Sequence, residues 1–140
     1  LNKKILSNYA NGYNIYNWAN SVLPKNANII TNHRSTYFLD KNHIFFEMSF
    51  HSNYLTLEEK KFYIKKIKDK KPNFILFYGH QKKYNYGLYD FKDCVTGLFK
   101  KKNNVGFHES RSIFNTNKKK YNSYIYKLDY NKLPECVKYN

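Results

Sequence analysis

The most polar cluster in the sequence that could carry chemistry is the run Asn32, His33 and Arg34. It follows a β-branched segment, residues 27–31, which is typical of a buried strand. Ligands of α/β sheets bind beyond the carboxyl ends of strands, so these three residues are the best candidates for ligand binding. A solvated loop is the simpler interpretation, and an enzyme built on this loop would need a concave pocket with a perturbed histidine.

No catalytic motif accompanies this cluster. None of the five histidines falls in an HExxH pattern, pairs with a cysteine, or lies four residues from another on an expected helix. The sequence has no Walker loop, GxGxxG or GxSxG, and its acidic residues form no pair spaced for glycoside or phosphoryl chemistry. We therefore expect no catalytic residue, no metal and no cofactor, and a chain that is not an enzyme on its own.

The two cysteines, Cys94 and Cys136, form neither a metal pattern nor a redox CxxC pair. In a reducing compartment they would be two buried thiols. In an oxidising compartment they could join a helix to the C-terminal tail, a disulfide worth about 3–4 kcal/mol for a loop of this size. The residues leave both alternatives open.

Lysine dominates the charge of the chain. The formal net charge is +15, and among the 25 Lys and Arg residues only Arg34 and Arg111 are arginine. Phosphate and base recognition favours the bidentate guanidinium. Because Lys, Asn, Ile, Tyr and Phe all have A/T-rich codons, a solvated lysine surface from a low-GC genome is the simpler explanation. The lysines expected to fill the outer face of one helix include Lys60, Lys61, Lys65, Lys66 and Lys68.

Two anionic partners fit such a surface. Nucleic acid could contact the lysines and stack on exposed tyrosines, for which the candidates are Tyr37, Tyr84, Tyr86 and Tyr121. No RNA-recognition, KH or helix-turn-helix pattern is present, however. An anionic membrane surface suits the combination better, because ammonium groups and amphipathic rings settle at lipid headgroups.

Periodicity in the first half predicts helix, strand and helix. The first helix, residues 15–23, ends before Pro24 and leads into a strand over 27–31. Residues 32–55 could be strand, turn and strand, or a loop. Thr56 and Glu59 form a capping box that opens a second helix, which Pro72 stops. Its inner side is expected to consist of Leu57, Tyr63, Ile64 and Ile67.

In the second half, the apolar run 74–78 predicts a central strand covered on both faces. Residues 86–101 predict a third helix with the lysine run 100–102 at its C-terminus and a turn at 103–104. Strands are expected over 105–107, 112–114 and 123–128, with a polar loop at 115–122. The inward residues of the third helix would be Leu88, Phe91, Val95, Leu98 and Phe99, beside Cys94.

These elements predict a single α/β domain over residues 1–140. It would be a layered sandwich with a central mixed sheet, about three helices and an antiparallel C-terminal hairpin. No apolar run is long enough to span a bilayer, and no signal-peptide pattern is present. The first residue is leucine, so we expect the chain to be part of a longer protein.

Three short motifs follow one another along the chain. A helix with Trp18 breaks at Leu23-Pro24 and leads through a polar turn to the Ile29-Ile30 strand; residues 71–76 and 124–128 supply a "Pro, x, aromatic, Ile" strand and a "Tyr-Ile-Tyr-x-Leu" strand. In this order they resemble the soluble C-terminal domain of membrane glycosyltransferases of the GT-C type. That group includes the dolichyl-phosphate-mannose-like and aminoarabinose-transferase-like enzymes. The resemblance covers nearly the whole chain, although each motif is short.

The resemblance implies an extracytoplasmic (periplasmic) domain tethered to its own transmembrane region. The catalytic acid of that family lies in the membrane part, so no residue here takes a catalytic role. The domain would cap the active-site cavity, help select the acceptor or hold a partner, with its basic surface on anionic lipid or on a polyprenyl-phosphate sugar donor or acceptor. This location would favour a Cys94–Cys136 disulfide. The alternative function is a basic nucleic-acid-binding protein from an AT-rich genome or mobile element.

Overall fold

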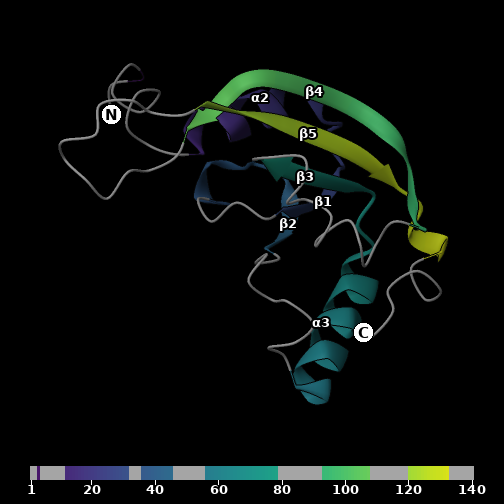
Figure 1. The fold of residues 1–140 in the computed structure, drawn as a ribbon. Coiled ribbons are helices and arrows are strands. Elements are labelled where there is room, and N and C mark those ends of the chain that lie inside the picture. The colour runs from purple at the N-terminus through teal and green to yellow at the C-terminus, as the bar shows by residue number, and fades with distance from the viewer. Residues whose placement is uncertain are drawn as a thin grey trace.

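The computed structural model describes residues 3, 12–31, 36–45, 56–78, 93–107 and 120–132 (Figure 1). In these ranges five strands form one sheet in the order β2-β1-β3-β5-β4. Two α-helices and two 3-10 helices complete the described elements. Their bounds are α2 Tyr13–Val22, β1 Asn28–Thr31, η1 Thr36–Phe38, β2 Asn42–Phe45, α3 Leu57–Lys70, β3 Phe74–Tyr78, β4 Val95–Phe107, β5 Lys120–Leu128 and η3 Tyr130–Lys132.

The sheet is mixed, and β3 is its central strand. β1 pairs in parallel with both β2 and β3. β5 pairs antiparallel with β3 on one side and with β4 on the other. The apolar run that predicted a central strand is therefore confirmed, as is the α/β class with antiparallel C-terminal strands.

Helix α2 forms where the apolar stripe predicts it. Ile15, Ala19 and Leu23 are buried on one side of the helix. The helix ends when the Leu23 amide donates to the Ala19 carbonyl at 3.0 Å, and the Ala27 amide donates to the Pro24 carbonyl at 3.0 Å. This tight connection delivers the chain into β1, as the sequence predicts.

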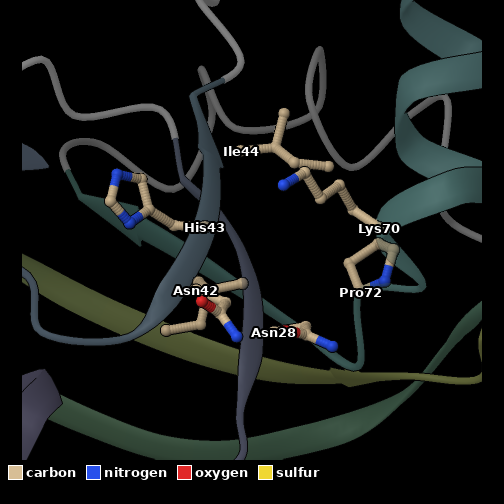
Figure 2. Close-up of a pocket in the computed structure, with 7 residues that line it drawn as sticks. Asn28, Asn42, His43, Ile44, Lys70 and Pro72 are labelled. Carbon is tan, nitrogen blue, oxygen red and sulfur yellow. The ribbon is translucent and has the colours of Figure 1, made fainter.

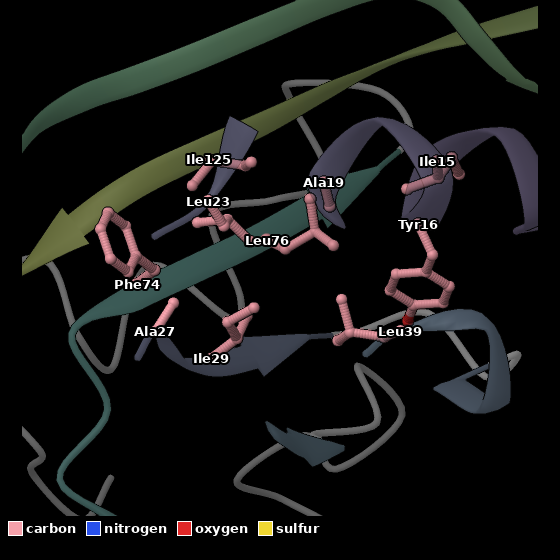
Figure 3. Close-up of a cluster of buried hydrophobic side chains, with 10 residues drawn as sticks. All are labelled: Ile15, Tyr16, Ala19, Leu23, Ala27, Ile29, Leu39, Phe74, Leu76 and Ile125. Atoms are coloured by element: carbon pink, nitrogen blue, oxygen red, sulfur yellow. The ribbon is translucent and has the colours of Figure 1, made fainter. Parts of the chain in front are cut away.

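Alternation along the strands builds a core on each face of the sheet. On the α2 face, Ile29 of β1 and Leu76 of β3 point toward the helix, with Ile125 of β5 beside them (Figure 3). On the other face, Ile30 and Ile75 pack with Ile67 of α3. Thr31 is a fully buried polar residue on β1, and its hydroxyl bonds the Tyr16 hydroxyl at 3.1 Å.

Helix α3 begins at the predicted capping box. The Thr56 side chain accepts from the Glu59 amide at 3.2 Å, and the Glu59 carboxylate accepts from the Thr56 amide at 2.9 Å. The helix ends at Lys71, which adopts a left-handed conformation (φ 49°) just before Pro72. Ile67 is buried as expected, but Leu57 is 56% exposed, so its predicted inward position is wrong. Leu57 belongs to the first turn, where α3 stands off the sheet (Figure 1).

The third predicted helix is wrong over residues 95–101, which lie in strand β4. Leu98 is 54% exposed, not inward. The β4–β5 pairing shifts register between Val95 and Gly97, between Leu98 and Lys100, and between Lys102 and Gly106. Each extra residue breaks the period-two alternation that would identify a strand, which leaves apolar spacings that resemble a helix. Residues 79–92 lie outside the described ranges.

Of the remaining sequence predictions, some differ from the structure and some lie outside the described residues. The predicted turn at 103–104 lies within β4, where Asn104 has a φ of 53°. In the uncertain segment 32–55, the described parts are η1 and the short strand β2, joined by a link that contains Asp40 and Lys41. The strand predicted over 112–114 and residues 115–119 lie outside the described ranges. Residues 120–122, expected in a loop, belong to β5.

Candidate functional site

The predicted ligand-binding residues Asn32, His33 and Arg34 lie outside the described residues. The structure does describe what flanks them. β1 ends at Thr31 and runs parallel to β2 and β3, so Asn32 follows the carboxyl end of the middle one of three parallel strands. On the far side of the segment, η1 carries Tyr37, which is 77% exposed and packs on Phe38 with ring centroids 4.3 Å apart.

A small recess lies at the opposite edge, near the amino ends of β1 and β2. Its wall includes Asn28, Asn42, His43 and Lys70. The space amounts to about 10 Å³, room for about one water molecule. Figure 2 shows His43 on one side of β2 and the Lys70 amine on the other, beside Ile44. His43 Nδ1 is 2.7 Å from the Lys41 carbonyl oxygen. These side chains therefore do not converge on one reacting atom, and the recess is too small for an organic ligand.

The predicted basic surface on α3 has a solvent-facing side chain at each described position. Lys61, Lys65, Lys66 and Lys68 are exposed; the side chain of Lys60 is outside the described set. With 3.6 residues per turn, Leu57, Lys61, Lys65 and Lys68 form one stripe, and Phe62 and Lys66 form the next. Both stripes face away from Ile67.

Apolar side chains accompany these lysines. Leu57 is 56% exposed and Phe62 is 63% exposed. Glu58 and Asp69 lie on the same side of α3, one near each end, so the charge of this side is mixed at its ends and cationic along its middle. We call the set Leu57, Lys61, Phe62, Lys65, Lys66 and Lys68 the α3 surface.

A second group of lysines lies on the β4–β5 ribbon, and the sequence assigned it to a helix end. Lys100, Lys101 and Lys102 are exposed in the middle of β4, and Lys127 is exposed on β5. Three of these ammonium groups lie near aromatic rings. Lys100 Nζ and Lys127 Nζ are 5.8 Å and 5.4 Å from the Phe99 centroid, and Lys101 Nζ is 5.5 Å from the Tyr124 centroid.

The ribbon was missed because its contacts join residues distant in the sequence. Two local signals argued against a helix. Gly97 would occupy a helix interior, where glycine is disfavoured, and the adjacent Val95 and Thr96 are β-branched residues that favour strands. Of the tyrosines considered for base stacking, Tyr121 on β5 is buried, so that expectation is wrong. Tyr37 is exposed, and Tyr84 and Tyr86 lie outside the described residues.

Two tyrosines of β5 stack on each other on the face opposite Phe99. The rings of Tyr124 and Tyr126 are stacked with centroids 6.3 Å apart. Burial raises the pKa of the Tyr126 hydroxyl above its usual value of 10.0, and the charge of the neighbouring Tyr124 raises it further. The Tyr126 hydroxyl is therefore neutral at physiological pH, and Lys101 Nζ lies near the Tyr124 ring.

Cys94 is fully buried and disulfide-bonded. Its backbone carbonyl accepts from the Asp129 amide at 2.9 Å, which fixes the start of β4 against the end of β5. Cys136 lies outside the described residues, so the pairing of Cys94 with Cys136 stays a prediction.

Two negative findings hold for the described ranges. No three His, Cys, Asp or Glu side chains there gather as metal ligands would. No helix within them combines the length and hydrophobicity that crossing a bilayer requires.

No curated protein and no solved structure matches the chain. Residues 7–139 match the family described as the DUF1420 C-terminal domain. Since this match spans nearly all of the 140 residues, the chain belongs to the DUF1420 C-terminal domain family.

Proposed function

We propose that this chain is the extracytoplasmic domain of a membrane-embedded glycosyltransferase that uses lipid-linked sugars. The domain is non-catalytic on its own and rests its basic surface on anionic headgroups, where it assists engagement of the acceptor or of a lipid phosphate. The observation that carries the proposal is the α3 surface, on which four exposed lysines stand beside the exposed side chains of Leu57 and Phe62.

The physical argument is that apolar and cationic side chains share one side of one helix. Juxtamembrane lysines contribute about 1 kcal/mol each near an anionic bilayer. Exposed apolar side chains between them can enter the boundary between headgroups and acyl chains. Ile67, near the C-terminal end of α3, packs on the sheet, and the first turns of the helix lie away from it (Figure 1), so the α3 surface can lie along a flat surface without interference from the described strands.

Three further observations support the proposal. The motifs that resemble the glycosyltransferase domain lie on α2 and β1, on β3 and on β5, in the order of the resemblance. The family is described as a C-terminal domain, which fits a unit that follows another part of a protein. Cys94 is disulfide-bonded, as in proteins of oxidising compartments such as the periplasm.

Vesicle co-sedimentation tests this proposal. We expect binding to phosphatidylcholine vesicles to rise about tenfold when about 30% of the lipid is phosphatidylglycerol, and to fall in about 0.5 M salt. Lys65→Gln with Lys68→Gln should weaken binding by about tenfold or more, at about 1 kcal/mol per lysine.

Lys25→Gln with Lys132→Gln is the matched control, because it removes the same charge from exposed positions off α3. It should change vesicle affinity by less than about threefold. Vesicle binding that is indifferent to both lipid charge and salt would refute the membrane role. Salt-dependent binding to short DNA or RNA at physiological ionic strength, without vesicle binding, would favour the nucleic-acid function instead.

A further inference from the structure

Two ammonium groups converge on one aromatic ring at the α2 face of the β4–β5 ribbon. Lys100 Nζ lies 5.8 Å and Lys127 Nζ lies 5.4 Å from the centroid of Phe99. Phe99 is half-buried, and behind it the ring of Phe74 lies 5.1 Å away. Phe74 belongs to the α2-side core (Figure 3), so the ring that gathers the two cations is held by the core.

A register shift explains why the two side chains share a face. Leu98 pairs with Tyr126 and Lys100 pairs with Ile125, so Phe99 is an extra residue in β4. Such an insertion re-aims the side chains beside it. Phe99 and Lys100, although adjacent in sequence, therefore both lie on the α2 face, whereas Lys101 lies near Tyr124 on the other face.

Gly97 presents no side chain beside this ring. It pairs with Lys127 across the ribbon, so the two residues share a face. A Cβ placed on Gly97 would have no atom within 4 Å. The space in front of Gly97 is therefore open, and Phe99 lies two residues along the strand.

The charge of the cluster is not balanced within the described residues. Among the described residues, no carboxylate forms an ion pair with Lys100 or Lys127. Two like charges near one ring repel each other, and an oxyanion between them would relieve that repulsion. Lysine binds phosphate as a point charge, without the fixed fork of arginine. The exposed part of the Phe99 ring can at the same time contact an apolar group.

We propose that Gly97, Phe99, Lys100 and Lys127 form a binding subsite for an organic phosphate. The phosphoryl group lies in the open space in front of Gly97, where it contacts the two ammonium groups, and the apolar substituent packs on Phe99. The subsite is on the ribbon, not on the α3 surface, and it requires no membrane. It therefore goes beyond the proposed function and stands or falls separately from it.

Phenyl phosphate is the probe, observed through backbone amide shifts of the ¹⁵N-labelled chain. It should shift the amides of Gly97 and Lys127 saturably, and bind about fivefold or more tightly than inorganic phosphate, because inorganic phosphate lacks the ring contact. Phenol should shift neither amide. Shifts concentrated elsewhere on the molecule, or equal binding of phenol, would overturn the assignment.

Charge variants separate the subsite from bulk attraction. Lys100→Gln with Lys127→Gln should weaken phenyl phosphate binding about tenfold or more. Lys101→Gln with Lys132→Gln removes the same charge from the opposite face and from η3. It should change the affinity for phenyl phosphate by less than about twofold. Equal losses in both pairs would mean that net charge alone attracts the ligand, and the subsite would be refuted.

Occupying the open space in front of Gly97 is the second test. Gly97→Val adds a β-branched side chain that suits a strand and meets open space, so the fold should persist with unchanged amide shifts away from β4. Affinity for phenyl phosphate should fall about fivefold or more through steric exclusion. Unchanged affinity in a folded Gly97→Val chain would mean that the ligand does not lie in front of Gly97.

Vesicles that contain phosphatidic acid identify the source of the phosphate. If the natural ligand is a lipid headgroup, Lys100→Gln with Lys127→Gln should weaken binding to these vesicles as much as it weakens phenyl phosphate binding. If it is a soluble phosphoester, the vesicles should leave the Gly97 amide unshifted while phenyl phosphate shifts it. The α3 variants should affect vesicles alone, so the two proposals can fail independently.

Discussion

The lysines of α3 and those of the β4–β5 ribbon carry the same charge on two different supports. On α3, Ile67 is the buried residue among the described side chains, and the lysines extend from the exposed sides of the helix. On the ribbon, both strands belong to the sheet, and Lys100, Lys101 and Lys127 lie near aromatic rings. The first arrangement suits a broad anionic surface, and the second suits one anion at a fixed position.

This difference shows why charge counts alone do not identify a site. Lysine side chains on an open helix lose rotamer entropy when they bind, so their affinity depends on how many act together. A lysine that packs on a ring has already lost part of that freedom, and two such lysines can discriminate between ligands. The variants that follow test whether the two supports differ as the structure indicates.

The largest effect is expected from the core beneath the ribbon. Ile125 is fully buried on β5, in the cluster that α2, β1 and β3 share (Figure 3). Ile125→Ala should lower the free energy of unfolding by about 3–5 kcal/mol, and Ile67→Ala on α3 by about 2–3 kcal/mol, because β5 is paired with a strand on each side and can relax into a cavity less easily than a helix can. Urea titrations followed by Trp18 fluorescence and by circular dichroism measure both.

Hydrogen exchange provides the control for this comparison. In Ile67→Ala, amides of α3 should exchange faster while those of β3 and β5 keep their protection, since local opening involves the least buried elements first. If Ile67→Ala costs as much as Ile125→Ala and lowers protection across the sheet, α3 is part of the same cooperative unit, and the contrast between the two supports fails.

A smaller loss is expected at the start of α3. Thr56→Ala removes the side-chain oxygen that accepts from the Glu59 amide, and loss of such a cap costs about 1 kcal/mol. Thr56→Ser keeps the acceptor and should restore stability. Thr96→Ala, at an exposed side chain on β4, is the matched threonine control. The thermal midpoint reports all three. A Thr56→Ser chain as unstable as Thr56→Ala would mean that the methyl group, not the hydroxyl, stabilises this end of the helix.

The capping box also marks what local sequence can predict. Thr56 and Glu59, the Leu23-Pro24 helix end and the apolar run of β3 are each determined by residues within a few positions of one another. For these elements the sequence and the structure agree. The inward position of Leu57 was wrong because amphipathic spacing indicates which side of a helix is apolar, but not how far along its length a partner covers it.

The ribbon shows where local reasoning ends. Strand β4 is defined by its pairing with β5, and its three register shifts disrupt the alternation that would have revealed it. Because this alternation is absent, a helix was predicted over residues 95–101. The Phe99 cluster could not be predicted at all, because Lys127 reaches it from β5 and Phe74 from β3. The polar run at Asn32, His33 and Arg34 stays a prediction.

The smallest effect concerns the face of the ribbon opposite Phe99. Burial, and then the charge of Tyr124, raise the pKa of Tyr126 above 10.0. The folded chain therefore keeps this proton to a higher pH than the unfolded chain does. The contribution of Tyr126 to stability is full below about pH 10 and is lost as the pH rises through the folded-state pKa.

Tyr126→Phe removes this titration. The urea midpoint of the variant should fall less than that of the parent chain between about pH 9 and pH 11, and the phenolate absorbance should lose one of its late-ionising groups. Tyr37→Phe is the control, because it changes an exposed ring. Its urea midpoint should fall as much as that of the parent chain. Tyr126 lies on the face opposite Phe99, with Tyr124 and Lys101. Tyr126→Phe should therefore also leave phenyl phosphate binding at Gly97 unchanged. A coupled change in that binding would mean that the two faces of the ribbon do not act separately, and that the cations around Phe99 are oriented through the whole strand pair.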